Sequence, residues 1–193
     1  MAKLVGPAGR VLAFEPNPRL FELLQNYVDI NGFRLRTQCH AKAVTAKGGQ
    51  SLNFSVSATD PKNGALMPAL PGQQTRPGLT ELSVETVALD DLAVGPIDFI
   101  KIDVEGAEET LWAGMQQTIR RSPDIQIILE FNAIRCQDTK RMIAEMAALF
   151  PLRALGYDAI IRPADPEQLM AESEDTMLYR SRRDPVDFAS AGR

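Results

Sequence analysis

The sequence predicts an α/β fold built on a doubly wound, mostly parallel sheet. Strand-like segments alternate with segments of helical periodicity, which favours parallel pairing through crossover helices. Three of the strand-like segments, 11–14, 97–102 and 125–129, are mostly apolar. Strands covered by helices on both faces need this composition, because neither face meets water. The chain has 193 residues, 45% of them hydrophobic, which suits one domain. We place that domain at residues 1–180 and expect a flexible tail at 181–193.

Turn and capping residues define the elements of the first half. Arg10–Glu15 follows the turn 6–9 and is a predicted strand. Asn17 and Pro18 are a suitable N-cap and first helical residue, and Gly32 suits the end of that helix. The apolar residues between them recur at helical spacing: Leu20, Leu23, Leu24, Tyr27 and Val28. Two more strands are predicted, at 37–44 and, from its alternating pattern, at 51–57.

The segment Ala58–Thr80 differs from its surroundings because it is rich in proline and glycine and shows no periodicity. A loop of this length is uncommon in a compact domain unless it is functional or disordered. We therefore predict a loop here and consider it a candidate lid over a bound acceptor, where it would exclude water.

The second half continues the alternation of strands and helices. Its predicted strands are 83–89, 97–103, 125–131, 152–157 and 176–179. The predicted helices are 105–120 and 138–150, the latter capped by Asp138. From Ser181 onward the chain is polar, and we expect it to fray.

Composition excludes several classes of protein. The net charge of −4 argues against a nucleic-acid partner, which would require a basic surface. No apolar run approaches the ~20 residues that cross a bilayer, and the N-terminus lacks the apolar core of a signal peptide. Cys39 and Cys136 do not form a C-x-x-C pair, and the sequence has no cysteine or histidine metal cluster. We therefore expect a cytoplasmic protein with free thiols and no metal or membrane partner.

Each of the three apolar strands is followed by an acidic residue: Glu15, Asp103 and Glu130. Open α/β sheets bind ligands outside the carboxyl ends of their strands. We therefore predict that the three carboxylates converge at one edge of the sheet, around a nucleotide-sized site. In such sites an acid in the position of Glu15 accepts hydrogen bonds from ribose hydroxyls. The alternative is that Glu15 helps to cap the following helix.

The other candidate residues each have a structural alternative. Lys101 shares a strand face with Asp103, and it would pair with Asp103 or with a neighbouring acid, in a role that is either structural or catalytic. Asn132 shares a face with Glu130, and both suit either a ligand contact or a hydrogen-bonded strand end. His40, the only histidine, is a candidate general base, although a structural or adenine-side role suits its position better.

Acidic residues also gather after the strand that ends near Asp103. Glu105, Glu108 and Glu109 fall at the expected start of a helix. Acids in a first helical turn favour the helix dipole, which is the structural alternative to a functional role for these residues.

Two stretches resemble the signature sequences of the FkbM-type S-adenosylmethionine (SAM)-dependent methyltransferases. They are Val-Leu-Ala-Phe-Glu-Pro-Asn-Pro at 11–18 and Ile-Lys-Ile-Asp-Val-Glu-Gly-Ala-Glu at 100–108. Segments 43–44, 51–57 and 86–90 are similar to that family in the same order, so the resemblance covers about 4–179.

The resemblance implies a seven-stranded, Rossmann-like sheet of the class I SAM methyltransferase type, with an antiparallel last strand. It implies methyl transfer from SAM, usually to a hydroxyl of a sugar, polyketide or other small molecule. Glu15 would bind the ribose, with Asn17 beside it, and His40, Ala41 and Lys42 would lie near the adenine. Asp103 would lie near the methionine part and the acceptor.

The chain departs from the family at its start. The first strand and its glycine loop are absent, and the ribose acid normally follows that loop by ~20 residues, which is more than precede Glu15. We expect a late start codon, a truncated gene or expressed chain, or a strand supplied by another chain. The unpaired edges left in the sheet favour self-association. We expect weak SAM binding and little or no turnover.

The predicted reaction is in-line displacement at the sulfonium methyl, in which the protein aligns the acceptor and removes its proton. Asp103, Glu130 and His40 are the candidate catalytic bases, and the sequence does not choose among them. Two other hypotheses remain: a non-catalytic methyltransferase-like remnant that binds a partner or nothing, and an NAD-dependent oxidoreductase in which Glu15 binds the NAD ribose.

Overall fold

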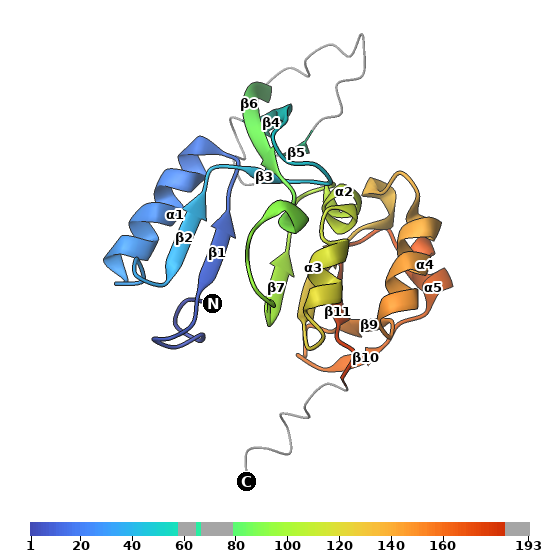
Figure 1. Ribbon diagram of the computed structural model, residues 1–193. Coiled ribbons are helices and arrows are strands. Elements are labelled where there is room, and N and C mark those ends of the chain that lie inside the picture. The colour runs from blue at the N-terminus through green and yellow to red at the C-terminus, as the bar shows by residue number, and fades with distance from the viewer. Residues whose placement is uncertain (58–64, 67–78, 184–193) are drawn as a thin grey trace. The chain divides into compact units, whose positions relative to one another are not determined.

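The computed structural model describes residues 1–57, 65–66 and 79–183. The chain divides into two compact units, Met1–Asp91 and Leu92–Arg193 (Figure 1). Each unit combines helices with strands, which confirms the α/β class. The prediction of a single domain over 1–180 and of a flexible tail stays a prediction, although Ser181 is buried and residues from 184 lie outside the described part.

The first unit contains a small parallel sheet, a helix and a second sheet. Its elements are β1 (Val11–Phe14), α1 (Pro18–Ile30), β2 (Thr37–His40), β3 (Ala43–Val44), β4 (Ser51–Ser57), β5 (Ala65–Leu66), β6 (Leu79–Val87) and the short 3-10 helix η1 (Leu89–Asp91). Strands β1 and β2 pair in parallel, with Phe14 opposite His40, and α1 lies alongside them (Figure 1). The other sheet has the order β3-β6-β4-β5 and packs Ala43, Phe54 and Val84 into a small core.

The second unit, as far as its residues are described, is a five-stranded mixed sheet with four α-helices. Its elements are β7 (Phe99–Ile102), α2 (Glu108–Ala113), α3 (Gln116–Arg121), β8 (Gln126–Phe131), η2 (Ala133–Arg135), α4 (Thr139–Leu149), β9 (Arg153–Leu155), β10 (Ile161–Pro163), α5 (Pro166–Ala171) and β11 (Thr176–Arg180). The strand order is β10-β9-β11-β8-β7. Its core consists of fully buried apolar side chains: Met115, Ile119, Ile125, Ile127, Leu129, Met146 and Leu178.

Two of the three sheets in the described part of the chain are mixed, whereas the β1–β2 sheet is parallel, so the fold is less parallel than predicted. The parallel pairs are β1–β2, β3–β6 and β7–β8, whereas the other pairs among the described strands are antiparallel. Short connections such as the one between β9 and β10 allow antiparallel pairing, which needs no crossover helix. β11 is antiparallel to β8, as the resemblance implied for the last strand.

Strands β1 and β7 are less buried than their apolar sequences predict. All four residues of β1 are half-buried, and Phe99 in β7 is 38% exposed. Within the described chain, β1 pairs only with β2 and β7 only with β8, so each has one edge without a neighbouring strand. Self-association through such edges stays a prediction.

Several boundaries differ from the predictions. The strand expected at 37–44 is divided into β2 and β3, with Ala41 and Lys42 between them. The helix expected at 105–120 begins only at Glu108, after Glu105 and Gly106, which have positive φ. It is divided into α2 and α3 at Gly114, which caps α2. The strand expected at 83–89 begins at Leu79. Most of the segment 58–80, where a loop was predicted, lies outside the described residues. The loop prediction is wrong for Ala65–Leu66, which form β5, and for the start of β6 at Leu79.

Both longer helices begin where the sequence predicts. Asn17 caps α1 and accepts the amide hydrogen of Arg19, and Pro18 is the first helical residue. The Asp138 side chain accepts the amide hydrogen of Arg141 at 3.0 Å and caps α4. These side chains satisfy backbone donors that have no partner inside the helix.

Replacing Asp138 with alanine is expected to lower the free energy of unfolding by about 1 kcal/mol, because it leaves a donor of the first turn of α4 without its acceptor. Urea denaturation followed by circular dichroism measures this change. Asp138→Asn retains a capping oxygen and should cost less. Lys140→Ala, at an exposed position of the same helix, is the control and should change the value by less than about 0.5 kcal/mol. An equal loss in the control would contradict the capping role.

Candidate functional site

Two of the predicted site residues, Asp103 and Glu130, lie side by side in the second unit. Ile102, the last residue of β7, is paired with Leu129 of β8 in the parallel register. The next residues along the two strands are therefore Asp103 and Glu130, and each carboxyl group shifts the pKa of the other. Two ionised carboxylates repel each other, so their closeness favours a proton on one of them. This confirms the predicted convergence for these two acids.

The pKa values of the two carboxyl groups shift in opposite directions. The hydrogen bond with Asp103, partial burial and the negative charges of Asp103, Asp175 and Glu105 raise the pKa of Glu130 to about 7. Although burial opposes it, the hydrogen bonds from Glu130 and Lys101 and the charge of Arg135 lower the pKa of Asp103. Opposite shifts of neighbouring carboxyl groups are typical of sites that need one acid and one base.

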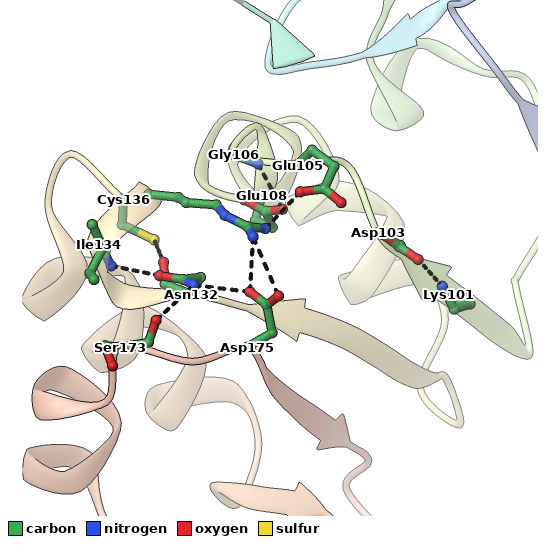
Figure 2. A network of polar contacts seen from close by, with 11 residues as sticks. Lys101, Asp103, Glu105, Gly106, Glu108, Asn132, Ile134, Cys136, Ser173 and Asp175 are labelled. Atoms are coloured by element: carbon green, nitrogen blue, oxygen red, sulfur yellow. Dashed lines mark hydrogen bonds and ion pairs between the residues drawn. The ribbon is translucent and has the colours of Figure 1, made fainter. Parts of the chain in front are cut away.

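Lys101 forms an ion pair with Asp103, as their shared strand face predicted (Figure 2). Both side chains are more than two-fifths exposed, so the pair contributes little to stability. Its effect on the site is electrostatic, because the ammonium group favours the ionised form of Asp103.

Beside this pair lies a second polar network, centred on Arg135 of η2. The Arg135 guanidinium contacts Glu105 at 2.9 Å and Asp175 at 3.2 Å. Asn132 donates to Asp175 at 2.9 Å and to the carbonyl of Ser173 at 3.3 Å, and its side-chain oxygen accepts the amide hydrogen of Ile134 (Figure 2). Asn132 is therefore a hydrogen-bonded strand end, which was the structural alternative for this residue.

The acids of the β7–α2 segment have structural partners. Glu108 is 2% exposed and accepts the amide hydrogen of Gly106 at 3.0 Å. Burial raises the pKa of Glu108. Glu109 accepts the amide hydrogens of Gln137 and Asp138 and pairs with Arg141, so it joins α2 to the start of α4. Glu108 and Glu109 lie in the first turn of α2, as the sequence predicted, and acidic residues at this position favour the helix dipole.

In the first unit, Glu15 and His40 lie at the carboxyl ends of β1 and β2. The amide of Glu15 donates to the carbonyl of His40 at 3.0 Å, and the His40 ring stacks on Phe14 with centroids 4.9 Å apart. A Glu15 carboxyl oxygen accepts the amide hydrogen of Asn17 at 2.8 Å. Burial raises the pKa of Glu15, and the bond to Asn17 partly offsets this. Glu15 thus helps to hold the start of α1, which was the structural alternative for this residue.

The remaining candidates of the first unit have simple surroundings. The Asn17 side chain is buried and caps α1, and Ala41 is exposed between β2 and β3. Glu15, Asn17, His40 and Ala41 belong to one unit and Asp103 and Glu130 to the other. The expected convergence of Glu15 with the other two acids therefore stays a prediction.

Arg135 and Asp175 were not among the residues singled out from the sequence. Their partners lie 30 to 40 residues away along the chain, and no local pattern signals such pairs. Cys39 and Cys136 are free thiols. Within the described residues, no cluster of histidine, cysteine and acidic side chains suits a metal ion, and no helix has the length and apolar composition to cross a membrane.

Comparison with known proteins identifies the family. No curated protein matches the chain significantly. Among solved structures, the methyltransferase FkbM from Methylobacillus flagellatus KT is similar, with 17% identity and a TM-score of 0.48. The match covers 89% of this chain and 36% of that one. The model of the methyltransferase FkbM domain matches residues 1–159. Because that match includes most of the 193 residues, the chain belongs to the methyltransferase FkbM domain family.

Proposed function

We propose that this chain functions in methyl transfer from SAM to a hydroxyl group of a small molecule, such as a sugar or a polyketide. Membership of the methyltransferase FkbM domain family supports the reaction class. The observation that carries the proposed chemistry is the Asp103–Glu130 carboxyl pair, in which Glu130 has a pKa of about 7. A group with a pKa near the working pH is well suited to take a proton from an attacking hydroxyl.

Glu130 is the preferred base among the three candidates. Asp103 has a lowered pKa, so it is a weaker proton acceptor. Its lasting negative charge suits a place near a sulfonium cation instead. His40 stacks on Phe14 in the other unit, an arrangement that suits a contact with a planar base. When bound, SAM supplies a methyl group that is already activated on sulfur, so the protein has to align the acceptor and remove its proton.

The first unit has features that fit the nucleoside part of SAM. Glu15 uses one oxygen for the Asn17 amide, and a carboxylate has about four lone-pair sites, so acceptor capacity remains for ribose hydroxyls. The stacked Phe14 and His40 rings provide a planar aromatic surface near Ala41, where we propose the adenine binds. No other cofactor is required by this proposal.

Isothermal titration calorimetry with SAM and S-adenosylhomocysteine tests the proposal. We expect weak but measurable binding of both, as the sequence predicts, and about tenfold weaker binding again by Glu15→Gln, because the neutral amide is a poorer acceptor for the ribose hydroxyls. Glu22→Gln is the matched control, since Glu22 is exposed on α1, and it should bind like the unaltered protein.

Three results of these titrations, with NAD as an additional ligand, would count against the proposal or against the role of Glu15. If neither compound binds, the non-catalytic hypothesis is favoured. If NAD binds and SAM does not, the oxidoreductase hypothesis is favoured. Equal weakening by Glu15→Gln and Glu22→Gln would contradict the role of Glu15 while leaving the activity itself open to other tests.

A further inference from the structure

Arg135 joins three segments of the second unit at the carboxyl end of β8. It belongs to η2, which follows β8. Its guanidinium contacts Glu105, in the loop after β7, at 2.9 Å and Asp175, just before β11, at 3.2 Å. The Arg135 side chain is 32% exposed, and its two partners are 29% and 38% exposed, so the contacts are partly shielded from water. A planar guanidinium can bridge two carboxylates at once, which an ammonium group does less well.

The loop between β7 and α2 adopts an unusual backbone conformation. Glu105 has φ of 49° and Gly106 has φ of 95°. Only Glu105 and Ala159 combine positive φ with a side chain larger than glycine's in the described part of the chain. A left-handed glutamate costs roughly 1 kcal/mol or more and persists only where its surroundings hold it. The contact with Arg135 is such a restraint, and the Gly106–Glu108 hydrogen bond is another.

The other end of the bridge is itself fixed. Asp175 accepts a hydrogen bond from Asn132, which is 8% exposed and is held by two further hydrogen bonds. Figure 2 shows Asn132, Asp175 and Glu105 gathered in this network, with the Lys101–Asp103 pair beside it. Arg135 therefore connects a rigid anchor to the strained loop.

We propose that Arg135 is a positioning residue, which holds Glu105 in its left-handed conformation and thereby keeps Asp103 in register with Glu130. Asp103 is separated from Glu105 by Val104 alone, so a change of backbone at Glu105 moves the Asp103 carboxyl group directly. Displacements of about 1 Å at a reacting group have large effects on rate. The catalytic consequence rests on the function proposed above, whereas the positioning itself does not.

The charge of Arg135 also acts on the pair. The charged groups that face Asp103 and Glu130 are Lys101, Glu105, Asp175 and Arg135. Of these, Lys101 and Arg135 lower the pKa of Asp103. Removing the guanidinium should therefore raise the pKa of Asp103 in addition to loosening the loop. A role confined to general stability would leave this titration unchanged.

The test compares Arg135→Gln and Arg135→Lys with the unaltered chain. The matched control is Arg162→Gln, which removes the same charge from an exposed Arg–Asp pair in the same unit. Amide hydrogen exchange reports on the loop, and carbon-13 NMR of the carboxyl groups reports on Asp103 and Glu130. In Arg135→Gln we expect about tenfold faster exchange at Gly106 and Ala107, with exchange in β8 and α4 unchanged. We also expect an upward shift of the Asp103 titration.

Arg135→Lys retains the charge but bridges two carboxylates less well, so it should restore most of the titration and only part of the slow exchange. It also carries the test if Arg135→Gln fails to fold. The proposal is overturned if exchange rises equally throughout the second unit, if neither readout changes, or if Arg162→Gln has the same effect. Because neither readout uses SAM, a failure of the proposed methyl transfer remains distinguishable from a failure of the positioning role.

Discussion

Replacing Leu129 with alanine is expected to lower the free energy of unfolding of the second unit by about 2–5 kcal/mol. Leu129 is fully buried in β8, and its paired residues are Ile102 in β7 and Leu178 in β11. Both partners are also buried, so the deleted atoms leave a cavity in the core where β8 packs between β7 and β11. Such a cavity adds to the lost transfer free energy of the side chain.

Urea denaturation measures this loss as a lower midpoint with an unchanged slope. Ile134→Ala is the matched control, because Ile134 follows the same strand but is 74% exposed. It should change the free energy of unfolding by less than about 0.5 kcal/mol. A loss below about 1 kcal/mol for Leu129→Ala would mean that the core around β8 is not packed as described.

The elements that sequence reasoning placed correctly have strong local signals. Asn17 followed by Pro18 marks the start of α1, and Asp138 marks the start of α4. The alternation of apolar and polar residues predicts β4 with its bounds, Ser51–Ser57. In these segments the hydrogen bonds and side-chain patterns that fix the structure come from neighbouring residues.

The elements that were not predicted, or were predicted with wrong bounds, have weak local signals or depend on residues distant in sequence. Asp165 and Pro166 start α5 with the same kind of signal as Asn17 and Pro18, but α5 has only 6 residues and little periodicity. The split between α2 and α3 falls at Gly114, whereas the late start of α2 depends on the left-handed turn at Glu105, a conformation that propensity disfavours for glutamate. That turn is held by residues distant in sequence.

The candidate site likewise contains some residues that the sequence predicted and others that it did not. The rule that ligands bind at the carboxyl ends of parallel strands predicted that Asp103 and Glu130 would meet, and they do. The rule carries no information on Arg135 or Asp175, since their contacts depend on the tertiary structure of η2 and on the segment before β11. It also could not assign the proton between the two acids, because that depends on burial and on all the surrounding charges.

The carboxyl group of Glu130 is expected to titrate near pH 7, well above the usual value of about 4.5. The bond to Asp103, partial burial and the negative charges of Asp103, Asp175 and Glu105 all favour its protonated form. Carbon-13 NMR of the side-chain carboxyl groups measures this, and Glu130→Gln assigns the signal. Glu145→Gln, at an exposed position of α4, is the control and should not alter it.

The sign of the pH dependence of stability follows. Between about pH 4.5 and pH 7, Glu130 binds a proton in the folded state but not in the unfolded state. Its contribution to the free energy of unfolding is therefore fully present below pH 4.5 and is lost as the pH rises through 7. Asp103 has the opposite dependence, because its pKa is lowered: its contribution is present above the usual aspartate pKa and is lost as the pH falls.

Asp103→Asn separates the causes of the Glu130 shift. Asparagine still accepts a hydrogen bond but has no charge, so protonated Glu130 loses its ionised partner and the Glu130 pKa should fall toward its usual value. If Glu130 is the base of the proposed reaction, kcat/KM in the unaltered protein should rise tenfold per pH unit below about pH 7 and level off above it. The same variant should shift this rise to lower pH. Glu130 would be excluded as the base if kcat/KM did not rise toward pH 7 in the unaltered protein and this rise did not move to lower pH in Asp103→Asn. The reason is that the group that removes the proton must be deprotonated first.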